Sequence, residues 1–161
     1  MDLKLKKINW KVLVVSFVLV FSLGFIGSIF TGQSSNSEWY ESIKPAITPP
    51  GWVFPIVWNL IFFLIALSLY FSWINSNHKE RGRIAIAFGI NFILNILWSF
   101  LYFGLRSPLL AFYEILLLEI SIFAMIYVTS SIDKKSSLLL IPYLLWVSFA
   151  VILNYLTIIN I

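Results

Sequence analysis

Residues 51–75 read GWVFPIVWNLIFFLIALSLYFSWIN, an apolar run that contains no charged side chain. A helix that crosses a bilayer needs about 20 mostly apolar residues, so this run predicts a transmembrane helix. Four further runs of the same kind lie at about residues 11–30, 83–104, 108–131 and 136–158. All five runs are continuous and lack the alternation of apolar and polar residues that membrane β-strands show. The sequence therefore predicts an all-α integral membrane protein, a single domain over residues 1–161 built as a five-helix bundle.

The composition of the whole chain agrees with a membrane location. Of its 161 residues, 60% are hydrophobic and 11% are charged, and the mean hydropathy is +0.94. Soluble domains carry about 25% charged residues, so this chain lacks the polar cover of a protein that folds in water. The net charge of +4 therefore does not indicate a nucleic-acid partner. The absence of cysteine excludes disulfides, zinc–thiolate sites and thiol catalysis.

The positions of lysine and arginine predict how the bundle crosses the membrane. Basic residues concentrate in cytoplasmic loops. With the N-terminus inside, Lys44 and Arg106 face outward, and the basic residues that face the cytoplasm are Lys4, Lys6, Lys7, Lys11, Lys79, Arg81, Arg83, Lys134 and Lys135. We therefore expect the N-terminus inside and the C-terminus outside.

Residues 31–50, TGQSSNSEWYESIKPAITPP, form a segment that is too long for a minimal connection between helices. Its prolines stiffen the backbone, and the pair Trp39 and Tyr40 suits a membrane interface. Two interpretations follow. The segment is either an interfacial anchor with a rigid linker, or a lid over an opening among the helices.

Polar and aromatic side chains share one face on each of three predicted helices. The faces consist of Pro55, Trp58 and Phe62; of Asn91, Asn95, Trp98 and Tyr102; and of Tyr143, Trp146, Ala150 and Asn154. Unpaired amides are unfavourable in hydrocarbon, so these faces should point into the bundle. At a rise of about 1.5 Å per residue, Trp58, Asn95 and Trp146 lie in the half nearer to residues 31–50. This geometry permits a pocket under a lid, although Asn91 and Asn95 could simply link helices and Trp98 could serve packing.

Several of these stretches resemble the TspO/MBR family of tryptophan-rich sensory and translocator proteins. KPAITPPGWVFPIVWNLIF, residues 44–62, is similar to the family's first loop and second helix. The likeness continues through NILWSFLYFGLRSP, LAFYEILLL and LLLIPYLLWVSFAVILNYLTIIN, and covers about residues 22–160. The double proline followed by WVFPIVW, together with PYLLWVSFA, makes the resemblance specific.

The resemblance implies a five-helix bundle whose first loop closes over a pocket for porphyrins such as protoporphyrin IX, with the porphyrin as ligand and no separate cofactor. Matched pocket positions are Tyr40, Pro50, Trp58, Asn95, Trp146 and Ala150, and the shared faces add Phe62 and Trp98 as candidate ligand-binding residues. The family is often dimeric through its third helix, where Ala85 and Gly89 offer a seam. A sterol-binding motif is incomplete after Tyr155, which favours a microbial cell membrane.

We therefore expect a membrane receptor or carrier for porphyrins. One alternative is an enzyme that degrades porphyrin with light and oxygen, in which Trp58 and Trp146 would be catalytic. No metal site is expected, because His78 is the single histidine.

Two carboxylates lie within the fourth predicted helix. Glu114 matches an acidic position of the family, and we expect it to pair with Arg106. Glu119 has no such counterpart, and a glutamate at this depth needs a partner, a proton or water. It suggests a second alternative function, a small proton-coupled exporter, or else a polar seam between subunits.

Overall fold

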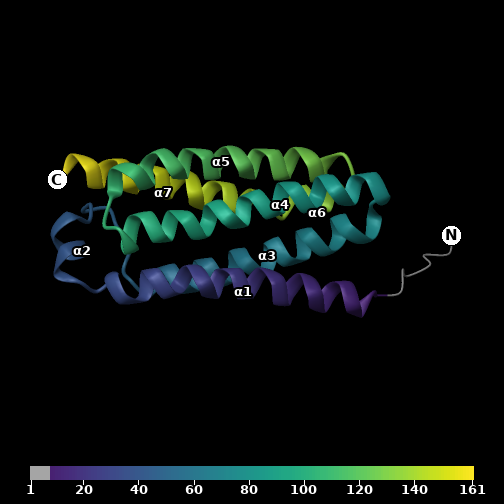
Figure 1. The fold of residues 1–161 in the computed structure, drawn as a ribbon, viewed down its shortest axis with the longest axis horizontal. Helices are drawn as coiled ribbons and strands as arrows, with labels where there is room; N and C mark the ends of the chain where they lie inside the picture. Colours follow the sequence, from purple (N-terminus) through teal and green to yellow (C-terminus); the bar gives the residue numbers. More distant parts are fainter. Residues whose placement is uncertain (1–7) are drawn as a thin grey trace.

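The computed structural model describes residues 8–161, and that part of the chain consists of helices joined by short connections (Figure 1). The elements are α1 (Trp10–Ser34), α2 (Glu38–Ile43), α3 (Val53–Asn75), α4 (His78–Ser99), the π-helix η1 (Phe100–Gly104), α5 (Pro108–Ser130), α6 (Lys134–Leu138) and α7 (Ile141–Ile159). Within these described residues, five stretches are long and apolar enough to cross a membrane. The predicted five-helix membrane fold is confirmed, and its direction across the membrane stays a prediction.

The five long helices run side by side along the long axis of the molecule and alternate in direction (Figure 1). α1 packs against α3 and α4, while α5 packs against α4 and α7. The short helix α2 and the C-terminus lie at one end of the bundle, and α6 lies toward the other. Buried apolar side chains from α1, α3, α4, α5 and α7 form one continuous core along the axis.

α4 begins at His78, well before the predicted start at residue 83. The side-chain oxygen of Asn77 accepts hydrogen bonds from the backbone N–H groups of Lys79 and Glu80, at 3.0 Å each. The Glu80 carboxylate accepts one from the Asn77 N–H at 2.8 Å. This reciprocal capping box satisfies the free N–H groups of the first turn. The polar residues that seemed to separate two helices therefore form the first turn of α4.

The segment at residues 31–50 is partly helical, which corrects the expectation of a plain loop. α1 continues to Ser34, whose hydroxyl donates to the Phe103 carbonyl at 3.2 Å. The Ser37 hydroxyl then caps α2 by accepting from the Tyr40 N–H at 3.3 Å. At the far end of α2, the Asn160 amide donates to the Ile43 carbonyl at 3.3 Å. The end of α1 is thus fixed to η1, and α2 is fixed to the cap residue of α7.

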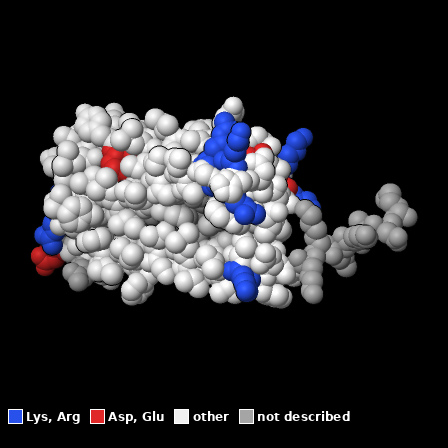
Figure 2. Space-filling model, turned by 45° about the vertical axis from the view of Figure 1, so that its right-hand side comes forward, with Lys and Arg blue, Asp and Glu red and all other residues white. Residues whose placement is uncertain are grey.

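Charge is distributed along the bundle as a membrane protein requires. Figure 2 shows lysine and arginine side chains gathered toward the end where α3 leads into α4, while the flank of the bundle is largely uncharged. Exposed basic residues at this end are Lys79, Arg81, Arg83, Lys134 and Lys135. They are among the residues on which the predicted orientation depends.

Candidate ligand-binding site

Aromatic rings from α3 and α7 face each other across the bundle. The centroids of Phe54 and Trp146 are 5.7 Å apart, and those of Trp58 and Tyr143 are 6.2 Å apart. Both pairs meet edge to face, the arrangement that aromatic rings favour. Phe62 stacks on Trp58 at 5.4 Å. We call these five rings the aromatic cluster; it brings together the predicted residues Trp58, Phe62 and Trp146.

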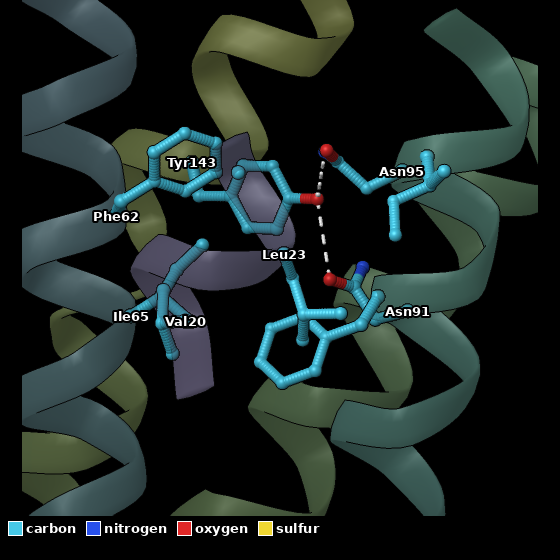
Figure 3. Close-up of a pocket in the computed structure, with 10 residues that line it drawn as sticks. Val20, Leu23, Phe62, Ile65, Asn91, Asn95 and Tyr143 are labelled. Carbon is cyan, nitrogen blue, oxygen red and sulfur yellow. Dashed lines mark hydrogen bonds between the residues drawn. The ribbon is translucent and has the colours of Figure 1, made fainter. Parts of the chain in front are cut away.

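A chain of hydrogen bonds lies beside the aromatic cluster (Figure 3). The Tyr143 hydroxyl accepts from the Asn95 amide at 3.1 Å and donates to the Asn91 carbonyl oxygen at 3.2 Å. The Asn91 amide in turn donates to the Ser121 hydroxyl at 2.8 Å. Asn91 and Asn95 therefore link α4 to α5 and α7, as one of the two interpretations of these amides predicted. Asn95 also borders an interior cavity.

This interior cavity is small. It is enclosed by α1, α3, α4 and α7, and its lining includes Gly24, Phe62, Asn91, Asn95 and Tyr143 (Figure 3). The space that it leaves is about enough for one water molecule. The aromatic and apolar side chains thus fill the interior, and a larger ligand would have to displace some of them.

A second group of rings joins α2 to η1 and the end of α4. Trp39 contacts Tyr102 at 6.0 Å between centroids, and Tyr40 contacts Phe103 at 5.7 Å. Trp98 stacks on Tyr102 at 5.2 Å. We call these five residues the α2 cluster. Burial, with smaller contributions from neighbouring Tyr102 and Glu41, raises the pKa of Tyr40 to about 12.

The other predicted site residues occupy different surroundings. The Trp98 indole N–H donates to Asn154 at 3.1 Å, so Trp98 has a packing role between α4 and α7. Ala150 is half-buried against the main core. Pro50 is exposed just before α3. Tyr40 therefore lies on α2 and Trp98 beneath that helix, while Trp58 and Trp146 belong to the separate aromatic cluster.

The expected pairing of Glu114 with Arg106 is wrong. Glu114 is buried, and within residues 8–161 neither carboxylate oxygen has a hydrogen-bond partner. The Arg106 guanidinium lies instead over the Trp39 ring, 5.6 Å from its centroid. Glu119 is half-buried and accepts a hydrogen bond from the Ser148 hydroxyl of α7. Ser148 of the same chain therefore supplies the polar partner that a glutamate at this depth needs.

Sequence reasoning missed Phe54 and did not single out the central role of Tyr143. Phe54 lies one helical turn before Trp58, so the i, i+4 spacing was a usable signal. The face predicted for the second helix contains Pro55 in place of Phe54. Tyr143 was placed on the correct face of the last helix, but a face alone does not reveal which partners its hydroxyl meets.

These features define an integral membrane protein: a five-helix bundle with an aromatic interior and a buried polar network. A profile of the TspO/MBR family matches residues 15–159, and the chain belongs to this family. The tryptophan-rich protein TspO of Archaeoglobus fulgidus is 42% identical over 145 residues, which cover 89% of this chain and 92% of that protein. The translocator protein of Bos taurus is 31% identical over 150 residues, covering 88% and 85% respectively.

Proposed function

We propose that this protein is a membrane receptor or carrier that binds porphyrins between α3 and α7. One observation carries the proposal. The rings of Phe54 and Trp58 on α3 face those of Trp146 and Tyr143 on α7. Flat aromatic ligands stack on such rings, and an indole N–H can donate to a polar group. The resemblance of Trp58 and Trp146 to positions of the family's porphyrin pocket supports the choice of ligand. The names sensory protein and translocator protein among the relatives suit a receptor or carrier.

The seam between α3 and α7 is the side of the bundle that we expect to open. Its rings contribute about 0.5–1.5 kcal/mol per aromatic pair, and Trp58 and Trp146 are only half-buried. α4, α5 and α7 are joined in addition by the hydrogen bonds of Asn91 and Asn95. A porphyrin that enters at the seam replaces ring–ring contacts with equivalent contacts to itself and leaves this network in place.

Quenching of tryptophan fluorescence by protoporphyrin IX tests the proposal on the purified full chain in lipid nanodiscs. We expect Trp146→Phe to weaken binding about fivefold, since it removes one ring contact and an N–H donor. Trp10→Phe is the matched control, because Trp10 begins α1 and is 65% exposed. Equal binding by the two variants would exclude Trp146 from the site.

A further inference from the structure

A second and larger space lies at the end of the bundle that carries α2. It is an open groove of about 540 Å³, within the range of about 300–1,000 Å³ found for ligand sites. Residues from α2, from the turn before α5, from the start of α5 and from the end of α7 form its walls, among them Trp39, Ile43, Arg106, Ser107, Leu109 and Ile158. None of these residues belongs to the aromatic cluster. We call this space the Arg106 groove.

Arg106 brings to the groove a positively charged side chain that forms no ion pair within the described residues. Its guanidinium lies over the Trp39 ring, 5.6 Å from the centroid, and a guanidinium stacked on a ring keeps its N–H edge free for hydrogen bonds. Within residues 8–161, Arg106 has no carboxylate in ion-pair range, whereas Lys44, the other cation at this end, pairs with Glu41. Ser107 adds a hydroxyl that does not cap α5.

We propose that the Arg106 groove binds the carboxylate of a compact apolar molecule. A guanidinium matches a carboxylate with two parallel hydrogen bonds, while Trp39, Ile43 and Leu109 offer apolar contacts to the body of the ligand. The walls meet at the end of the bundle and do not run along its side, so a ring system fits better than an acyl chain lying along the helices. The identity of that ring rests on the proposed function, because a porphyrin carries propionate carboxylates at its edge; the groove is then a second porphyrin site, separate from the aromatic cluster.

Comparing protoporphyrin IX with its dimethyl ester isolates the carboxylate, because the ester keeps the ring and loses the charge. Energy transfer from tryptophan to porphyrin measures both affinities in nanodiscs. We expect wild type to bind the acid about tenfold more tightly than the ester, the effect of one exposed charged hydrogen-bond pair. This comparison needs no variant, so it does not depend on the folding of a mutant.

Variants then assign the effect to Arg106. We choose Arg106→Asn because position 106 has a φ of 50°, which asparagine adopts more readily than most residues. Arg106→Asn should lose the preference for the acid, and Arg106→Lys should recover part of it. Lys44→Gln is the matched control and should retain the full preference.

Four results would overturn the inference. Equal affinity of wild type for acid and ester excludes carboxylate recognition; if Trp146→Phe still weakens both ligands, the proposed function stands and only the groove assignment fails. If Arg106→Asn and Lys44→Gln show the same preference for the acid over the ester, Arg106 is not the residue that recognises the carboxylate. Displacement of the acid by equimolar oleate assigns the groove to fatty acids. If neither porphyrin binds wild type, the groove assignment and the proposed function fail together.

Discussion

The indole of Trp58 packs edge to face against the ring of Tyr143, with centroids 6.2 Å apart. The hydroxyl of the same tyrosine accepts from Asn95 and donates to Asn91. One residue of α7 therefore connects the rings of α3 with the hydrogen bonds of α4. A ligand that displaces Trp58 therefore meets the ring of Tyr143 while the hydroxyl of that residue keeps α7 joined to α4.

Removing the Tyr143 hydroxyl should destabilise the bundle. Tyr143→Phe leaves the Asn91 oxygen without this donor and the Asn95 amide without this acceptor. We expect the free energy of unfolding in detergent to fall by about 1 kcal/mol, since hydrogen bonds inside membrane proteins contribute about 0.6 kcal/mol on average and up to about 1.7. Tyr113→Phe is the control, because Tyr113 is 62% exposed. If the two variants unfold alike, the network contributes nothing to stability.

Gly24 should be intolerant of a methyl group. A Cβ at this position would lie 2.5 Å from Cε2 of Phe62, whereas a Cβ at Gly32 would meet nothing within 4 Å. Both changes to alanine gain about 1 kcal/mol of helix propensity. Gly24→Ala also overpacks the interface between α1 and α3, which lowers the free energy of unfolding by about 1–3 kcal/mol. We therefore expect Gly24→Ala to unfold at a lower temperature than Gly32→Ala.

The same substitution should also be felt at Trp58, because Phe62 stacks on that indole. A shift of the Phe62 ring changes the surroundings of Trp58 and so its fluorescence emission. An unchanged emission spectrum in Gly24→Ala would show that Phe62 yields without disturbing the aromatic cluster.

The docking of α2 should weaken at high pH. Burial raises the pKa of Tyr40 to about 12 from its ordinary value of 10.0, so the folded protein favours the protonated phenol. This contribution to stability is complete below pH 10 and is lost as the pH rises from about 10 to 12. We expect faster hydrogen exchange in α2 over this window, relative to Tyr40→Phe at the same pH. Equal rates in the two proteins would show that Tyr40 ionisation does not affect α2.

The sequence predicted the five spans because a long apolar run has few alternatives in a chain this hydrophobic. It was less accurate at the ends of helices, where local hydrogen bonds decide. The capping box of Asn77 and Glu80 extends α4 into the polar residues before it. The Ser37 cap likewise starts a helix within residues 31–50, which were expected to contain none.

Helical periodicity also identified which side chains point inward. It correctly placed Trp58 and Trp146 on inward faces of their helices, but it could not tell that α2 would cover Trp98 and leave the aromatic cluster to one side. A face does not specify the neighbour that it meets. The same gap explains Glu114: its place in the fourth predicted helix does not identify its neighbours, and Arg106 contacts Trp39 instead. A homodimer through Ala85 and Gly89 stays a prediction.

The most direct test of the central claim is ¹⁹F NMR of the full chain labelled with 5-fluorotryptophan, recorded with and without protoporphyrin IX. Single Trp→Phe variants assign the signals. Binding between α3 and α7 predicts that the Trp58 and Trp146 resonances shift while those of Trp10 and Trp73 do not. Shifts confined to Trp10 and Trp73, with Trp58 and Trp146 unchanged under saturating porphyrin, would contradict an aromatic site inside the bundle.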